Sequence, residues 1–227
     1  MITGLSTSTG GSQSLVSVPT ETPVVFVVDD DVSVRDSLEL LIRSAGWEPL
    51  LFDSARQFLS QPRACVPNCM VLDVNLPDLS GLDLQKMICV ERTEMPIVFV
   101  TGYGDVPMTV KAMKAGAIEF LTKPFDDQSM LKAIEQALAR STVALALDAE
   151  MRMLINRHAS LSRREQEVMA LVITGLMNKQ VAYELGISEV TVKAHRGKVM
   201  EKMQARSFAE LINMASKLGL GDQPNTG

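Results

Sequence analysis

The sequence has few residues that could stabilise a fold through disulfide bonds or a bound metal ion. Of 227 residues only three are cysteine and two are histidine, and no cluster of Cys or His surrounds Cys65, Cys69 or Cys89. An odd number of isolated thiols supports neither a disulfide framework nor a zinc site. We therefore interpret the cysteines as small core or surface residues.

Long apolar stretches are also missing. No run approaches the roughly 18 apolar residues that a membrane helix needs, and the first residues lack the basic start and apolar core of a signal peptide. We expect a cytoplasmic protein with no membrane partner. The hydrophobic fraction of 46% is enough for an ordinary core, in one large domain or two small ones.

Charge is divided unevenly along the chain. The net charge is −5, but the part from Asn156 onward carries ten Lys or Arg against seven Asp or Glu, a net charge of +3, which leaves −8 for the part before it. An acidic first part and a mildly basic second part indicate two domains with different partners.

Residues 1–22 are rich in Ser, Thr and Gly and nearly free of charge, which predicts a disordered tail. Beyond them, short apolar runs alternate with amphipathic segments. The predicted strands are 24–28, 49–52, 70–73, 96–101 and 118–122, and the predicted helices are 33–45, 54–60, 82–91, 106–115 and one from 126 onward. This alternation predicts an α/β domain with a five-stranded, doubly wound parallel sheet.

Polar side chains stand where these strands end. Asp29 and Asp30 follow the first strand, Asp73 ends the third, Thr101 the fourth, and Lys123 follows the fifth. These groups can converge on one edge of the sheet, where α/β folds bind ligands. Clustered carboxylates repel one another unless a cation is present, and Mg²⁺ suits such oxygen ligands. A carboxylate beside Mg²⁺ and a lysine is placed to attack phosphorus.

Ordinary explanations exist for each group alone. Asp31 or Ser33 could cap a helix, and Lys123-Pro-Phe125 could be only a turn with proline at a helix start. The occurrence of one polar group at each of several successive strand ends favours a phosphate site.

The same residues resemble the receiver domain of bacterial response regulators over about Pro23 to Arg140. The matching motifs are Val27-Val-Asp-Asp-Asp31, Val71-Leu-Asp-Val-Asn-Leu-Pro-Asp-Leu-Ser-Gly81, Val100-Thr-Gly-Tyr-Gly-Asp105 and Lys123-Pro-Phe125. The segment from Gly102 to Ala117 is similar to the fourth-helix region of the FixJ group, the face through which such receivers signal or dimerise.

The resemblance implies a role for each site residue. Asp73 would be the phosphoacceptor, modified by a sensor histidine kinase. The Mg²⁺ ligands would be Asp29, Asp30, Asp73 and the main-chain carbonyl of Asn75. Lys123 would pair with the phosphoryl group, with Thr101 and Phe120 as the switch hydroxyl and switch aromatic.

No Gly or Pro interrupts the chain between Asp126 and Ala159, and its composition favours helix. We predict one long helix that leaves the first domain as a linker. It could be a coiled-coil or lever element that transmits phosphorylation, or a helix packed on its own domain. The sequence leaves both open.

The second half begins with a capping box, Ser162-Arg-Arg-Glu165. A short helix from Asn178 to Leu185, a glycine turn, and a helix from Ser188 to about Met203 form a helix-turn-helix pattern, whose second helix would lie in the major groove. On a helical wheel Val192, Val199 and Met203 face inward, whereas Lys193, Ala194, Gly197, Lys198 and Glu201 face outward.

This half resembles the LuxR/FixJ-type four-helix DNA-binding domain over about Ser160 to Leu218. By that resemblance Lys193, Ala194 and Gly197 would face bases, with Lys198 beside them. Asn178, Lys179, Thr191 and Arg196 would anchor phosphates. His195 could contact the DNA backbone or pack inward. The last helix, Phe208 to Leu218, resembles the one through which these domains pair.

We therefore expect a DNA-binding transcriptional response regulator of the FixJ/NarL type, with a receiver at 23–140, a helical linker at 141–159, a helix-turn-helix domain at 160–219 and tails at 1–22 and 220–227. Phosphorylation would promote dimerisation and promoter binding, with RNA polymerase as a candidate partner. The expected chemistry is phosphotransfer to its own Asp and autodephosphorylation, so we do not expect an enzyme. The alternatives are a Mg²⁺-dependent haloacid dehalogenase-like phosphatase and a receiver that acts only by protein contact.

Overall fold

The computed structural model describes residues 22–102 and 104–220, and these form two compact units that divide between Thr142 and Val143. The predicted tails lie outside the described residues, except for Thr22 and Leu220. Among the described helices, none combines the length and the apolarity that crossing a bilayer requires. The three cysteines are free thiols.

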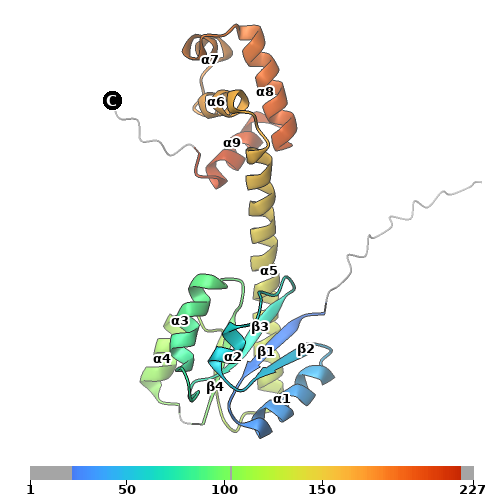
Figure 1. The fold of residues 1–227 in the computed structure, drawn as a ribbon, viewed down its shortest axis with the longest axis vertical. Coiled ribbons are helices and arrows are strands. Elements are labelled where there is room, and N and C mark those ends of the chain that lie inside the picture. Colours follow the sequence, from blue (N-terminus) through green and yellow to red (C-terminus); the bar gives the residue numbers. More distant parts are fainter. Residues whose placement is uncertain (1–21, 103, 221–227) are drawn as a thin grey trace, which may run out of the picture. The chain divides into compact units, whose positions relative to one another are not determined.

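The first unit contains the predicted parallel sheet of five strands, in the order β2-β1-β3-β4-β5. Figure 1 labels the first four of them. Its strands are β1 (Val24–Val28), β2 (Glu48–Phe52), β3 (Asn68–Asp73), β4 (Ile97–Thr101) and β5 (Glu119–Thr122). All neighbours pair in parallel, so the carboxyl ends of the strands lie along one edge. The central strands β1, β3 and β4 are buried almost throughout because helices cover both faces.

Five helices connect and cover these strands. They are α1 (Val32–Ser44), α2 (Ala55–Leu59), α3 (Gly81–Glu91), α4 (Val106–Lys114) and the first part of α5 (Asp127–Ala159). One face of the sheet packs on α2, α3 and α4 through Phe58, Leu84 and Ala112. The other packs on α1 and α5 through Ile42 and Ile134. Figure 1 shows α3 and α4 side by side on their face of the sheet.

The observed ends of the strands and helices of this unit agree with the prediction or differ from it by at most two residues. The largest difference is in β3, which begins at Asn68 rather than Met70 because the main chain of Asn68 and Cys69 continues the ladder with β1. Asparagine is not typical of a buried strand, so the sequence pattern did not indicate that β3 begins at Asn68. Asp31 is the cap of α1, since its carboxylate accepts a hydrogen bond from the N–H of Ser33 at 2.8 Å.

Helix α5 is continuous over 33 residues, as the absence of Gly and Pro predicts. Its first turns belong to the first unit, where Met130 and Leu138 are buried. Ser141 is also buried there, and its Oγ accepts a hydrogen bond from the N–H of Asn68 at 3.0 Å. This contact attaches α5 to the start of the strand that ends in Asp73.

The second unit is the predicted four-helix domain, together with the end of α5. Its helices are α6 (Arg163–Val172), α7 (Asn178–Leu185), α8 (Glu189–Met203) and α9 (Phe208–Lys217). Val168, Val181, Val192, Val199 and Leu211 are fully buried between them.

The capping box at the start of α6 also extends to α8. Glu165 accepts the N–H of Ser162 at 2.8 Å, and its Oε2 accepts a hydrogen bond from Lys202 Nζ at 2.6 Å. The Lys202 ammonium and the Ser162 N–H lower the pKa of Glu165 from 4.5 to about 2. The ionised carboxylate therefore stabilises the folded unit.

We expect Glu165→Gln to lower the free energy of unfolding of this unit by about 2 kcal/mol at pH 7. Because the folded pKa lies below the unfolded one, the stabilisation is complete above pH 4.5 and lost as pH falls toward 2. Amide hydrogen exchange in α6 and α8 measures it in the intact chain. Glu167→Gln, which breaks only surface pairs, should change protection little. Equal protection in both variants would refute the prediction.

Candidate functional site

Three predicted site residues meet at the carboxyl edge of the sheet. Lys123 Nζ donates to Asp29 Oδ2 at 2.6 Å and to Asp73 Oδ2 at 2.7 Å. Asp29 directly follows β1 and Asp73 is the last residue of β3, so parallel pairing sets the two carboxylates side by side. The N–H of Lys123 donates to the carbonyl of Thr101 at 2.7 Å, which attaches the loop after β5 to the end of β4.

The remaining carboxylate oxygens are held by the main chain. Asp29 Oδ1 accepts the N–H of Asp31, and Asp73 Oδ1 accepts the N–H of Asn75, both at 3.0 Å. Asp29 is fully buried and Asp73 is 6% exposed, whereas Asp30 lies in solvent. The two buried carboxylates are therefore fixed in orientation, and Asp73 keeps a small opening to solvent.

Burial and hydrogen bonding act against each other in this cluster. Burial raises the pKa of Asp29 above its ordinary value, although the bonds from Lys123 and the Asp31 N–H act in the other direction. Burial alone would lower the pKa of Lys123, but its bonds to Asp29 and Asp73 outweigh burial and raise it. Lys123 therefore remains protonated, and one ammonium faces more than one carboxylate.

The donor set fits a hard divalent cation. Carboxylate oxygens of Asp29, Asp30 and Asp73 lie within 4.8 Å of one another, the one such cluster of potential metal-binding residues within 22–102 and 104–220. The donors are all oxygens, which suits Mg²⁺, and Lys123 alone does not balance three negative charges.

The predicted switch residues stand next to this cluster. Thr101 is fully buried, and its Oγ1 accepts a hydrogen bond from Asn75 Nδ2 at 3.4 Å. Phe120 is half-buried on β5, and its ring lies 6.1 Å from that of Phe99, centre to centre. A Cβ on Gly104 would come within 3.0 Å of the Phe120 ring. The Phe120 ring can therefore occupy its position because residue 104 is a glycine.

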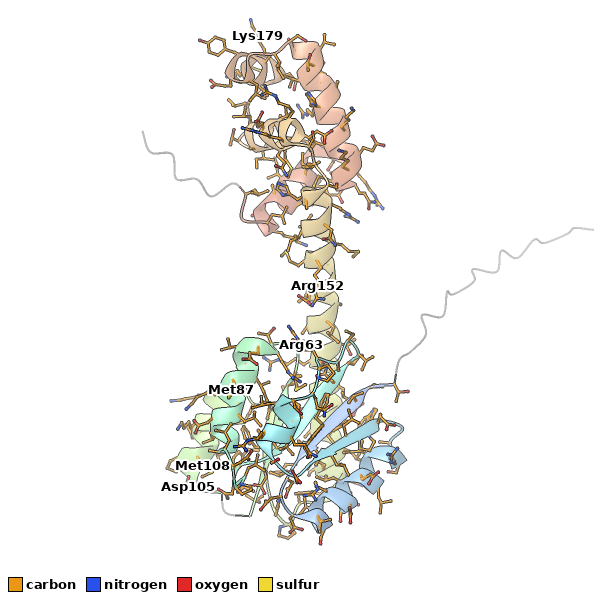
Figure 2. All side chains as sticks on the ribbon, viewed as in Figure 1. Arg63, Met87, Asp105, Met108, Arg152 and Lys179 are labelled. Atoms are coloured by element: carbon orange, nitrogen blue, oxygen red, sulfur yellow. The ribbon has the colours of Figure 1, made fainter. Side chains whose placement is uncertain are left out.

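Two contacts near the site were not predicted. Arg35 Nη1 donates to the carbonyl of Asp29 at 2.6 Å, and Asp105 caps α4 by accepting the N–H of Met108 at 2.7 Å (Figure 2). An aspartate just before the helical segment at 106–115 was the signal that could have identified the second.

Gly81 has the tightest surroundings at the site. Its N–H donates to the carbonyl of Val74 at 2.9 Å, and a Cβ on it would collide with the carbonyl oxygen of Asp73. Only glycine lets α3 begin this close to the end of β3.

We expect Gly81→Ala to reduce the free energy of unfolding of the first unit by about 2 kcal/mol, because the main chain that holds Asp73 must shift. Urea unfolding followed by fluorescence of Trp47, the single tryptophan, measures this loss. Gly102→Ala is the control, since a Cβ at Gly102 meets no atom within 4 Å. The prediction fails if the two variants unfold at the same urea concentration.

The helix-turn-helix prediction concerns the second unit. Gly186, with a φ of +63°, turns the chain after α7, and Ser188 caps α8 by accepting the N–H of Thr191 at 3.1 Å. Val192 and Val199 are fully buried, as the helical wheel predicts. The outer face of α8 consists of exposed residues, Lys193, Ala194, Gly197, Lys198 and Glu201.

The predicted phosphate anchors differ in their surroundings. Lys179 is exposed on α7 (Figure 2), and Thr191 is half-buried. Arg196 Nη1 donates to Asn178 Oδ1 at 3.1 Å, and its guanidinium lies 4.7 Å from the centre of the Phe208 ring. Arg196 thus joins α8 to α7 and α9, an internal role that the helical spacing of the sequence does not indicate. His195 has its Nδ1 buried without a hydrogen-bond partner among the described residues, which favours the packed alternative.

Comparison with known proteins identifies both units. Residues 25–135 match the response regulator receiver domain, and residues 159–215 match the bacterial regulatory proteins of the luxR family. Nodulation protein W of Bradyrhizobium diazoefficiens is 52% identical over 197 residues, 87% of each chain. The transcriptional regulatory protein FixJ of the same organism is 42% identical, over 86% of this chain and 96% of FixJ.

Among solved structures, the response regulator StyR is similar with a TM-score of 0.77 and 50% identity, over 87% of this chain and all of that one. These similarities support the predicted regulator and not the haloacid dehalogenase-like alternative. The chain belongs to the response regulators that combine a receiver domain with a LuxR-type helix-turn-helix domain, and it is a DNA-binding transcriptional regulator.

Proposed function

We propose that Asp73 is the phosphoacceptor of this regulator. The observation that carries the proposal is the double hydrogen bond of Lys123, which holds Asp73 beside the buried Asp29 at the carboxyl edge of the sheet. A carboxylate oxygen of Asp73 attacks the phosphorus of a phosphohistidine on a sensor kinase, the new O–P bond forms, and the P–N bond to the imidazole breaks. The Lys123 ammonium offsets negative charge that gathers on the phosphoryl oxygens.

Asp29, Asp30, Asp73 and the carbonyl of Asn75 would hold Mg²⁺. When bound, the ion supplies positive charge that balances the carboxylates and the incoming phosphoryl group. A cavity of about 550 Å³ opens beside Lys123, between the start of α1 and the loop after β5. The residues that line this cavity include Lys123 but not Asp73, so it borders the site on the Lys123 side.

The response to phosphorylation is proposed to pass through Thr101 and Phe120. Thr101 lies within hydrogen-bonding reach of Asn75, two residues after Asp73, so its hydroxyl can turn toward a phosphoryl group. This turn would shift a two-state equilibrium that favours a homodimer and promoter binding. In this proposal the receiver comprises residues 23–140, the helical linker residues 141–159 and the helix-turn-helix domain residues 160–219. Loss of the phosphoryl group to water would reset the receiver.

The proposed DNA contacts lie on α7 and α8. Lys193, Ala194, Gly197 and Lys198 would face base edges, while Thr191, Lys179, Asn178 and Arg196 would anchor phosphates. The exposure of the outer face of α8 supports the first set. Arg196 and Asn178 would keep the hydrogen bond between them and donate to DNA phosphates through their other N–H groups. RNA polymerase is a candidate further partner at a promoter.

The phosphoacceptor is tested by mass spectrometry of the intact chain after incubation with Mg²⁺ and a small acyl phosphate. We expect a mass gain of one phosphoryl group, located on the peptide that contains Asp73, dependent on Mg²⁺ and removed by hydroxylamine. A phosphoryl group on another residue would contradict the assignment. Steady hydrolysis of phosphate esters would instead support a phosphatase.

A further inference from the structure

Helix α8 carries one large apolar side chain that is turned outward. Val190 is 76% exposed, whereas Val192, Val199 and Met203 on the same helix are fully buried. A valine in this position gains nothing from burial, and its branched side chain forms helix less readily than alanine. Val190 therefore contributes little to the core of the unit, and its side chain is available for a contact with a partner.

Val190 lies on the face that is proposed to contact DNA. With about 100° per residue, it projects within about 20° of Gly197, and Lys193 and Ala194 flank this line on either side. A Cβ on Gly197 would meet no atom within 4 Å, so no neighbour requires a glycine there. Ala194 and Gly197, which follow Val190 along this face, have small or no side chains. Val190 therefore protrudes further from the helix than they do.

The charges around Val190 indicate what it contacts. Lys193 Nζ lies 3.4 Å from the Glu189 carboxylate, which places an anion next to Val190 in the first turn of α8. Phosphates repel a carboxylate, so the position of Val190, next to Glu189, is better suited to a base edge than to a phosphate of the DNA backbone. The N-terminal residues of a recognition helix are those that reach base edges.

We propose that Val190 is a specificity-determining residue whose methyl groups pack against the C5-methyl group of a thymine in the major groove. The thymine methyl is the apolar group that base pairs present there, and the side chain of valine can neither donate nor accept a hydrogen bond. The inference rests on the proposed DNA contacts of α8. It adds a residue and a base that those contacts do not name.

The test begins with selection of duplexes from a random pool by the phosphorylated protein. In the enriched duplex each thymine is then replaced by uracil, which removes only the methyl group. Wild type should lose about fourfold in affinity at one thymine of each half-site, the value expected for one buried methyl group. Val190→Ala should bind the thymine duplex more weakly and be nearly indifferent to uracil at that position.

A matched control separates this effect from a general loss of apolar surface. Val90→Ala removes the same atoms from a valine that is 81% exposed on α3, and it should respond to uracil as wild type does. Val190→Ala should not lower the stability of α8, since alanine is the better helix former.

The outcomes distinguish this inference from the function on which it rests. If the pool yields no enriched duplex, base reading by α8 is wrong and the role of Val190 is wrong with it. If a duplex is enriched, but every thymine-to-uracil change costs wild type and Val190→Ala the same, α8 reads DNA without Val190 and the inference is overturned.

Discussion

Asp73→Asn should abolish phosphorylation of this regulator by Mg²⁺ and a small acyl phosphate. The amide keeps the size of the side chain but lacks the anionic oxygen that attacks phosphorus, and no nearby group replaces it in the proposed mechanism. Asp29 is fully buried, whereas Asp73 is 6% exposed, so Asp29 is not open to a phosphoryl donor. Intact mass after incubation with the donor measures the effect, and the expected phosphorylated fraction is zero.

Asp36→Asn is the matched control for this variant. Asp36 is an exposed carboxylate on α1, so its replacement changes the net charge by the same amount without touching the site. This variant should be phosphorylated like wild type. A phosphorylated Asp73→Asn protein would show that another residue accepts the group.

Lys123→Met should affect both the stability and the chemistry of the receiver. The ammonium is largely buried and forms hydrogen bonds to Asp29 and Asp73, so its removal leaves two buried carboxylates that repel each other. We expect the free energy of unfolding to fall by about 3 kcal/mol at pH 7 without divalent ions. The rate of phosphorylation should fall by about a hundredfold, since one charge that offsets the phosphoryl oxygens is lost.

Urea unfolding followed by Trp47 fluorescence, with and without Mg²⁺, measures the first effect. Mg²⁺ should restore part of the stability of Lys123→Met, because a cation then separates the carboxylates. Lys86→Met, which removes an exposed ammonium paired with Asp83 on α3, should leave both stability and phosphorylation nearly unchanged. A Lys123→Met protein as stable as wild type would contradict the account of the site.

Much of the fold follows from local patterns. Apolar runs ending in Asp29 or Asp73 predicted both the strands and the edge where their polar ends meet, because parallel pairing brings carboxyl ends together. Capping side chains predicted the starts of α6 and α8, since those contacts span only three residues. The inward face of α8 followed from helical spacing alone.

Long-range contacts are what the sequence did not reveal. The link between Asn68 and Ser141 joins residues 73 positions apart, and Arg196 stacks on a ring from the next helix. The need for glycine at position 81 depends on the carbonyl of Asp73, whose direction only the folded turn defines. Such contacts have no periodicity and therefore no local sequence signal.

The measurement that tests the central claim most directly is DNA affinity and mass by sedimentation, on wild type and Asp73→Asn, each with and without Mg²⁺ and acyl phosphate. The duplex is the one enriched by selection. We predict that only phosphorylated wild type shifts toward a dimer and gains affinity, with the salt dependence that phosphate contacts produce. If wild type and Asp73→Asn bind the duplex alike under all conditions, Asp73 does not control DNA binding.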